Sequence, residues 1–385
     1  MIAVGQGYRA VALFLFNSCL AVFLSYGVFF NKVSSEYGLP ASATSFVFGV
    51  FAIFYSVSTL VLGLYMNKSG PGKTILLGGA LMGAGMILSS LANAYPLLVF
   101  AYGVIGGLGS GSMWLPTSYV VLDTFDSRSV KKVVGLVSAG TASGLFFFPP
   151  LESYLIENWG LKAAFLSVGF LILAFTLFAY LSSMKSKVIP KFNIRKAFSI
   201  LRTKHFGYLY AYYAIGNAFS RTLVLIFMVP LFASRGFGTV GSIALSLVGV
   251  GSMAGRLTTG IKRINEESVT SLGFILQGVS AAALYFANNP LIIALLALAL
   301  GVGYGAYIPE FPLMVRKYYG TEFYGTIFGT LLTSFGIGAF VGPVFEGIAV
   351  SSSWGYLPGF ITASALSLLV GFHLLLSKNK ASSIK

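Results

Sequence analysis

Charge is scarce in this sequence of 385 residues, of which only 9% are Asp, Glu, Lys or Arg. A soluble globular domain typically has about 25% charged residues, so the composition argues against a water-soluble fold. Hydrophobic residues instead make up 56% of the chain, and the mean hydropathy is +0.86. The sequence therefore predicts an integral membrane protein.

Cysteine and catalytic motifs are nearly absent as well. The single cysteine, Cys19, excludes a disulfide within the chain and a cysteine-based metal site. The two histidines, His205 and His373, fall at the ends of predicted spans, and the sequence contains neither HExxH nor a P-loop. We therefore expect no enzyme activity, no cofactor, no metal ion and no ATP-driven pumping. The N-terminus also lacks the charged region and cleavage site of a signal peptide, so the first apolar segment is expected to be retained.

Long apolar segments are what the chain has in abundance. Twelve of them contain about twenty or more residues, enough to cross a hydrocarbon layer about 30 Å thick as a helix. The sequence predicts an all-α integral membrane protein with twelve transmembrane helices. The expected spans are residues 8–30, 42–66, 74–93, 96–121, 133–153, 162–184, 206–233, 239–261, 268–287, 290–315, 323–350 and 356–377.

The 25 Lys and Arg residues are distributed unevenly over the predicted loops. Twenty fall in loops on one side of the membrane, three on the other side and two within spans. An excess of basic residues marks the cytoplasmic side. We therefore expect a multi-pass protein of the cell membrane with both termini in the cytoplasm. This topology accounts for the net charge of +15 without a nucleic-acid partner.

A basic segment divides the twelve spans into two groups of six. Residues 185–204 hold seven Lys and Arg and no acid, which indicates a cytoplasmic linker near anionic lipid headgroups rather than a regulatory site. The expected domains are an N-terminal six-helix bundle at residues 1–184 and a C-terminal six-helix bundle at residues 205–385.

The two bundles share residues at an offset of 196, as in an internal repeat. The matched pairs are Gly107 and Gly303, Gly109 and Gly305, Pro116 and Pro312, and Gly140 and Gly336. Two repeated halves predict a substrate site at their interface and rocking of one half against the other. The small-residue pairs Gly140-xxx-Gly144 and Gly338-xxx-Gly342 are expected to set close helix crossings.

Several motifs resemble those of the major facilitator superfamily over essentially the full length of the chain. The turn at residues 63–73 is similar to the superfamily signature between spans two and three, although Asn67 stands where the family usually has Asp. Within the superfamily, the chain resembles the monocarboxylate transporter and oxalate/formate antiporter group. That resemblance lies in residues 102–109, in Gly140, Gly144 and residues 149–151, in residues 159–166, and in residues 255–256.

The resemblance implies a monomeric secondary transporter that moves small organic anions, such as monocarboxylates, by alternating access. Proton symport and anion exchange both remain open as coupling modes. Efflux of amphipathic drugs or of other small solutes is the alternative within transport, and it would tolerate the loss of arginines in the membrane. A transporter-like sensor that does not translocate its ligand is a further alternative.

Two arginines lie within predicted spans, where an ionisable side chain is costly and usually functional. Arg221 lies near the middle of span seven, and Arg256 lies in span eight, where the monocarboxylate group has an arginine that binds the substrate carboxylate. A guanidinium suits this ligand because its planar fork donates two parallel hydrogen bonds and keeps its charge. The family often has an acid or amide one helical turn earlier, where this chain has Ser252, so the sequence provides no acid for proton coupling there.

Both arginines also have structural interpretations. Arg256 lies six residues before Lys262, so its side chain could reach the cytoplasmic helix end or pair with Glu310. Arg221 could pack toward a helix-end carbonyl or an acid. Glu310 is the candidate proton carrier or gate, since burial of a carboxyl favours its neutral form. Pairing with an arginine would instead keep Glu310 ionised.

Further polar and aromatic residues are predicted to bind substrate together with the arginines and Ser252. In the superfamily, spans one, four, seven and ten line the cavity, which favours four residues: Asn17, Trp114, Arg221 and Tyr304. The other candidates are Tyr55, Thr141, Tyr307 and Thr333. Glu152 and Glu346 fall near the outer ends of their spans, where a solvated role is expected.

Overall fold

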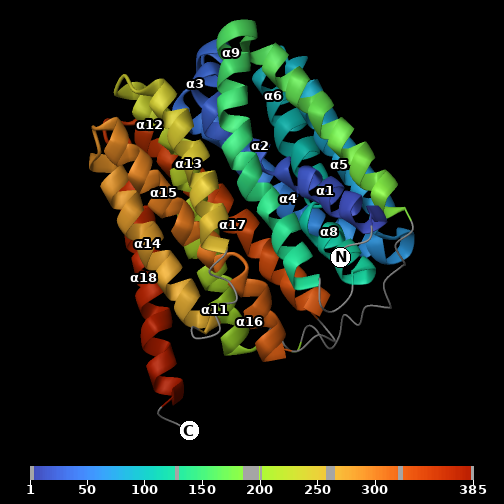
Figure 1. Cartoon of the computed structure of the whole chain (residues 1–385). Helices are drawn as coiled ribbons and strands as arrows, with labels where there is room; N and C mark the ends of the chain where they lie inside the picture. Colours follow the sequence, from blue (N-terminus) through green and yellow to red (C-terminus); the bar gives the residue numbers. More distant parts are fainter. Residues whose placement is uncertain are drawn as a thin grey trace. The chain divides into compact units, whose positions relative to one another are not determined.

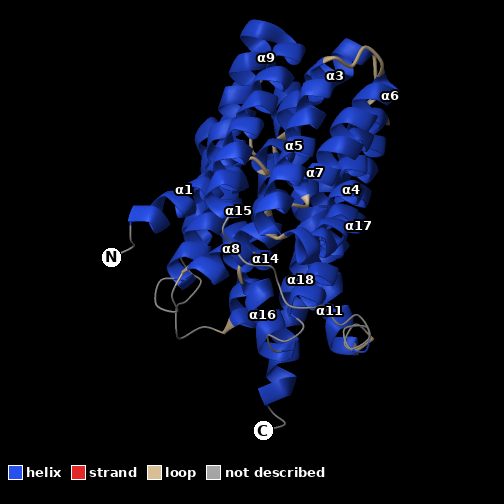
Figure 2. Ribbon diagram, turned by 90° about the vertical axis from the view of Figure 1, so that its right-hand side faces the viewer, coloured by secondary structure: helices blue, strands red, loops and turns tan. Residues whose placement is uncertain are grey.

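A computed structural model describes residues 4–125, 130–184, 199, 202–256, 265–319 and 324–382. Within these residues every regular element is a helix (Figure 2). The chain forms two compact units, Met1–Phe192 and Asn193–Lys385. The predicted linker at residues 185–204 lies outside the described residues except for Ser199 and residues 202–204.

The helices of each unit follow one another along the chain (Figure 1). Those of the N-terminal unit are α1 (Val4–Ser18), α2 (Ala21–Leu24), α3 (Tyr26–Tyr37), α4 (Ala41–Ser69), α5 (Pro71–Ser90), α6 (Tyr95–Leu98), η1 (Val99–Gly106), α7 (Gly107–Ser110), α8 (Trp114–Thr124) and α9 (Val130–Ser183). Those of the C-terminal unit are α11 (Lys204–Tyr212), η2 (Tyr213–Arg221), α12 (Thr222–Ser234), α13 (Gly238–Arg256), α14 (Glu266–Phe286), α15 (Pro290–Tyr307), α16 (Glu310–Tyr319), α17 (Tyr324–Ser351) and α18 (Leu357–Ser382). The elements η1 and η2 are π-helical segments.

Twelve membrane crossings fit the described helices. Eleven segments are long and apolar enough to span a bilayer, and one of them, Gly135–Ser183, contains 49 residues. At about 1.5 Å per residue this segment is long enough for two crossings. It bends at Gly160, whose φ of 83° is strained for any residue with a side chain. The bend falls between the predicted fifth and sixth spans, so the prediction of twelve helices is confirmed.

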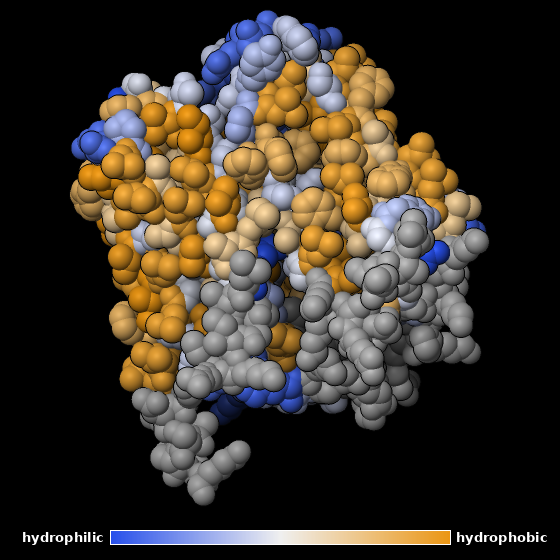
Figure 3. All heavy atoms as spheres, in the orientation of Figure 1, coloured by the Kyte–Doolittle hydropathy of each residue, from blue (hydrophilic) through white to orange (hydrophobic). Residues whose placement is uncertain are grey.

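The surfaces of both units are apolar, as expected of helices in contact with lipid. Figure 3 shows hydrophobic residues over most of the visible face, with hydrophilic residues gathered mainly near the helix ends. Large side chains such as Phe147, Phe170, Leu295 and Phe372 are more than half exposed. In a water-soluble protein so much exposed apolar surface would cause association, whereas in a bilayer it is solvated by acyl chains.

Small residues set the closest helix contacts in both units. A Cβ atom on Gly140 would overlap the carbonyl oxygen of Phe14, which confirms a close crossing of α9 and α1. In the second unit, a Cβ atom on Gly338 would overlap the carbonyl oxygen of Ala214, where α17 crosses η2. The two units thus repeat one packing arrangement. By its place in the packing, Gly140 corresponds to Gly338. The sequence repeat at an offset of 196 predicted Gly336, two residues earlier, as the equivalent residue.

Two carboxyl groups are placed differently from the prediction. Glu152 and Glu346 were expected to be solvated at outer helix ends, but both are fully buried, with 0% of their surface exposed. Helix α9 continues past the predicted span end at residue 153 to the bend at Gly160, so Glu152 lies about 12 Å inside that bend. Glu346 is covered because its carboxyl lies against Gly359 in the first turn of α18.

Candidate functional site

The π-helical segment η2 places Arg221 inside the C-terminal unit. A π-helix has wider turns than an α-helix and often occurs at functional sites. The widening is visible in a hydrogen bond from the Ser220 hydroxyl to the carbonyl oxygen of Ile215, five residues earlier, at 2.9 Å. Arg221 is the last residue of this segment, and its side chain is buried, with 5% exposed.

Aromatic rings rather than acids surround Arg221. Its guanidinium carbon lies 4.6 Å from the ring centroid of Tyr304 and 5.5 Å from that of Phe335. Such cation–π contacts contribute up to about 2 kcal/mol when water is excluded. No described acid forms an ion pair with Arg221, and its Nε atom has no hydrogen-bond partner among the described residues. Among the described residues, Arg221 therefore has aromatic faces rather than a carboxylate beside its buried charge.

Arg256, the last residue of α13, approaches the same tyrosine. Its guanidinium carbon lies 6.0 Å from the Tyr304 ring centroid, and it donates a hydrogen bond to the Tyr304 hydroxyl. We call Arg221, Arg256 and Tyr304 the dibasic cluster. Two guanidinium groups around one ring repel each other, and this repulsion would be relieved by an anion.

A hydrogen-bonded network adjoins the dibasic cluster. The Tyr307 hydroxyl donates to Gln277 Oε1 at 2.7 Å, and Gln277 Nε2 donates to the carbonyl oxygen of Gly216 at 2.9 Å and to Ser367 Oγ at 2.8 Å. The Tyr307 ring packs against that of Tyr304, with 6.2 Å between the ring centroids. This network holds α15, η2, α14 and α18 together and fixes the position of the Tyr304 ring.

Replacing Gln277 tests how strongly this network stabilises the unit. In Gln277→Leu, the Tyr307 hydroxyl is left with its 3.4 Å hydrogen bond to Asn217 and the Gly216 carbonyl loses the amide donor, and each buried hydrogen bond lost costs about 0.5–1.5 kcal/mol. We expect a clearly lower melting temperature in detergent, measured by intrinsic fluorescence. The exposed Asn158, whose amide bonds only to the Tyr154 carbonyl one turn away, gives the control Asn158→Ala, which should leave the melting temperature unchanged. Equal melting temperatures for all three proteins would contradict this role.

The structure joins only some of the predicted binding residues. Tyr304 lies with both arginines, whereas Tyr307 is engaged in the network described above. Ser252 is fully buried in α13, and its hydroxyl has no hydrogen-bond partner among the described residues. Glu310 begins α16 and is buried, with 3% exposed. Thr333 instead hydrogen-bonds to Tyr210 at 3.2 Å.

The predicted residues of the N-terminal unit form a separate set. Asn17 Nδ2 donates to Thr117 Oγ1 at 3.0 Å, and Thr141 Oγ1 donates to the carbonyl oxygen of Asn17 at 3.3 Å. Tyr55 is buried in α4, with its ring 6.2 Å from that of Phe51. Trp114 is half-buried at the start of α8.

Sequence reasoning missed three residues around the arginines. Phe335 contacts Arg221, while Asn217 and Gln277 accept hydrogen bonds from Tyr307. The signal for Gln277 was available, since it is an amide in the middle of an otherwise apolar span. No comparable signal distinguishes Phe335 among 35 phenylalanines.

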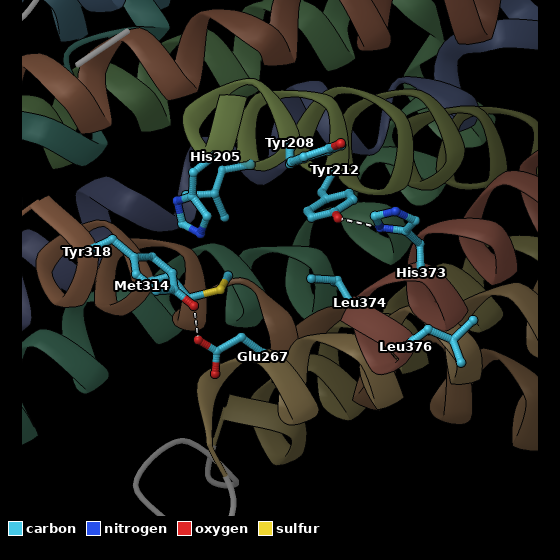
Figure 4. Close-up of a pocket in the computed structure, with 10 residues that line it drawn as sticks. His205, Tyr208, Tyr212, Glu267, Met314, Tyr318, His373, Leu374 and Leu376 are labelled. Carbon is cyan, nitrogen blue, oxygen red and sulfur yellow. Dashed lines mark hydrogen bonds between the residues drawn. The ribbon is translucent and has the colours of Figure 1, made fainter. Parts of the chain in front are cut away.

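A hollow in the C-terminal unit lies at the ends of α11, α14, α16 and α18 (Figure 4). This pocket has a volume of about 540 Å³, and both histidines line it. His373 Nδ1 lies 2.6 Å from the Tyr212 hydroxyl, while His205 Nδ1 lies 2.9 Å from that of Tyr319. Neither arginine of the dibasic cluster lines the pocket. No group of three metal-binding side chains occurs in the part of the chain that the structure describes.

An ion cluster closes one side of this pocket. Lys317 Nζ lies 2.9 Å from carboxylate oxygens of Glu266 and Glu267, and the Tyr318 hydroxyl donates to Glu267. Partial burial acts against the charge of Lys317, but the two carboxylates outweigh it and raise the pKa of its ammonium group. Lys317 is shared between two carboxylates, so the described ion cluster keeps one net negative charge beside the pocket.

Comparison with known sequences identifies relatives of the whole chain. A sequence model of the Major Facilitator Superfamily matches residues 11–263 and 213–384. Monocarboxylate transporter 13 of Bos taurus is 25% identical over 393 residues, covering 97% of this chain and 89% of that protein. An uncharacterized MFS-type transporter of Escherichia coli, YhjX, is 24% identical over 333 residues, covering 82% of this chain and 81% of that protein.

A shorter match is closer in sequence. Monocarboxylate transporter 9 of Rattus norvegicus is 31% identical over 171 residues, which cover 44% of this chain. The match spans about a third of the length of that relative, 34%. Among solved structures, a bacterial homolog of the human lysosomal transporter Spinster, in an inward-facing and occupied conformation, has a TM-score of 0.73 with 14% identity. That similarity covers 97% of both chains and concerns the fold alone.

Proposed function

We propose that this chain, which belongs to the Major Facilitator Superfamily, is a secondary transporter of small organic anions, most simply monocarboxylates. It is a multi-pass membrane protein related to monocarboxylate transporters. The observation that carries the proposal is the dibasic cluster, in which Arg221 and Arg256 approach one tyrosine ring and Arg221 has no described acid partner. Transport would occur by alternating access, as proton symport or anion exchange.

The charge of the dibasic cluster favours an anion over a neutral or cationic substrate. Burying an ion without a partner costs several kcal/mol, so the site is most stable when a counter-ion is present. A carboxylate has two oxygens in one plane and can accept parallel hydrogen bonds from the guanidinium fork. Tyr304 limits the space between the cations and orients both of them. These features support a substrate with one carboxylate and a small apolar body.

Uptake into proteoliposomes tests the proposal. Purified protein would be reconstituted and supplied with radiolabelled lactate, pyruvate, acetate or oxalate, with and without an imposed pH gradient. Saturable uptake of at least one acid is expected, and a requirement for the gradient would indicate proton symport. Stimulation by unlabelled acid on the opposite side, without a gradient, would indicate exchange. Failure of folded protein to take up any of the four acids would contradict the proposal and favour amphipathic solutes.

Tyr304 provides a graded test of the same site. Tyr304→Phe keeps the ring against Arg221 but removes the hydroxyl that accepts from Arg256, so we expect KM for the carboxylate to rise roughly tenfold. Tyr304→Ala removes both interactions and should raise KM further. The control Tyr154→Phe changes an exposed tyrosine of the N-terminal unit. Equal kinetics for Tyr304→Phe, Tyr304→Ala and the wild type would show that this ring does not organise the site.

A further inference from the structure

A buried carboxyl group in the N-terminal unit is not explained by anion binding. Glu152 on α9 has 0% of its surface exposed, and neither of its oxygens has a hydrogen-bond partner among the described residues. An ionised carboxylate without a partner costs several kcal/mol in such surroundings. The buried group is therefore stable only as the neutral acid, which carries a proton.

Among the described residues, the groups that face Glu152 include no cation. Ser25, at the break between α2 and α3, lies beside the carboxyl, but its hydroxyl donates to the carbonyl oxygen of Val22 at 3.1 Å. Tyr102 in η1 is within electrostatic reach, is fully buried, and its hydroxyl also has no hydrogen-bond partner among the described residues. Next to Tyr102, the Tyr26 hydroxyl is occupied, because it donates to the carbonyl oxygen of Thr44 at 2.9 Å.

The charged side chains of α3, and that of Glu157 one turn beyond Glu152 on α9, point to solvent. Lys32 and Glu36 on α3 are exposed, as is Glu157 on α9. None of them forms an ion pair with Glu152 in the described part of the chain. The Glu152 carboxyl thus faces two hydroxyl groups at a break in the first membrane span. Broken helices inside membranes commonly mark ion-binding sites.

The second unit has a related carboxyl in a different setting. The pattern Pro-x-x-Glu occurs at residues 149–152 and again at 343–346. Glu346 is equally buried, but its carboxyl lies against Gly359 in the first turn of α18, a helix of 26 residues. The positive end of that helix stabilises a carboxylate there. Glu152 lies instead beside Ser25, the residue before α3, and the oxygens of both carboxyls lack a hydrogen-bond partner among the described residues.

We propose that Glu152 is a proton-binding site of the N-terminal unit and that its proton is the coupling ion of transport. This inference rests on the proposed transport function. A hydronium ion on one side of the membrane gives its proton to a Glu152 carboxylate oxygen, which forms the O–H bond and leaves water. After the conformational change, water on the other side accepts the proton and restores the carboxylate. One proton carried with one carboxylate adds no net charge to the protein, so the transport step moves no net charge across the membrane.

Infrared spectroscopy tests the proton site without any substrate. A buried protonated carboxyl gives a carbonyl band distinct from that of a carboxylate. We expect this band in the purified full-length wild type, its loss in Glu152→Gln, and its retention in the control Glu157→Gln, which changes an exposed acid on the same helix. A band unaffected by Glu152→Gln overturns the proposal. If Glu152→Gln does not fold, Glu152→Asp should shift the band, and an unshifted band has the same consequence.

Transport measurements test the coupling role. In Glu152→Gln, accumulation driven by a pH gradient should be lost, whereas exchange of labelled for unlabelled carboxylate at equal pH should continue. Glu157→Gln should retain both activities. Gradient-driven accumulation by Glu152→Gln, or accumulation by the wild type that follows a sodium gradient instead, overturns the coupling role. Absence of carboxylate transport in the wild type contradicts the proposed function, while the infrared band still decides whether Glu152 holds a proton.

Discussion

Arg221→Ala is expected to remove most carboxylate transport while leaving the protein folded. Arg221 would form a buried, hydrogen-bonded charge pair with the substrate carboxylate. Removing one partner of such a pair costs about 2–5 kcal/mol of binding free energy, which corresponds to a rise in KM of roughly 30-fold to 3,000-fold. The physical reason is the position of Arg221, which is buried and held between the Tyr304 and Phe335 rings rather than by an acid. Initial rates of labelled uptake over a wide range of substrate concentration would measure the change.

Two control variants separate charge from geometry at this position. Arg221→Lys keeps a positive charge but loses the planar fork, so its KM should fall between that of the wild type and that of Arg221→Ala. Arg235→Ala removes an arginine that bonds instead to the carbonyl oxygen of Tyr285 at 2.6 Å, and we expect it to retain uptake. Equal KM values for Arg221→Ala and the wild type would eliminate Arg221 as a substrate ligand.

Gly305→Ala is expected to impair both stability and transport. Helices α13 and α15 lie side by side (Figure 1), and a Cβ atom on Gly305 would overlap the carbonyl oxygen of Ser252. Backbone atoms cannot rotate away, so the two helices must separate, at a cost of about 1–3 kcal/mol. Gly305 follows Tyr304 directly, and α13 ends at Arg256, so the same movement displaces two members of the dibasic cluster.

The matched control is Gly207→Ala in α11, where a Cβ atom would meet nothing within 4 Å. Melting temperature and uptake rate would be measured for both variants in parallel. Gly305→Ala should lower both quantities, and Gly207→Ala should change neither. A Gly305→Ala protein with wild-type stability and uptake would show that α13 and α15 tolerate a wider spacing than the structure has.

The membrane spans were predictable because bilayer thickness determines the length of an apolar helix. Even the bend at Gly160, which divides Val130–Ser183 into two helical parts, falls between two predicted spans. The π-helical segments were not predictable. Widening of a helix depends on how its neighbours pack, and the sequence of η2 carries no local sign of it.

The charged residues of the site could be predicted from the sequence, but the residues that they contact could not. Arg221 and Arg256 could be proposed because a cation in an apolar span is unusual, and Tyr304 because span ten lines the cavity in the superfamily. Their convergence depends on tertiary packing of η2, α13 and α15. Glu152 was misjudged because its environment depends on where α9 bends rather than on its own neighbours in the chain. Burial of a carboxyl therefore cannot be inferred from distance to the end of a span.

If the dibasic cluster recognises the charge of a carboxylate, the protein should distinguish lactate from lactamide, two ligands of nearly the same shape of which only lactate is charged. Calorimetric titration of the purified protein with each ligand measures this difference. We expect saturable heat with lactate, little or none with lactamide, and loss of the lactate signal in Arg221→Ala. Equal binding of the two ligands, or undiminished lactate binding by Arg221→Ala, would contradict recognition of the charge by the cluster.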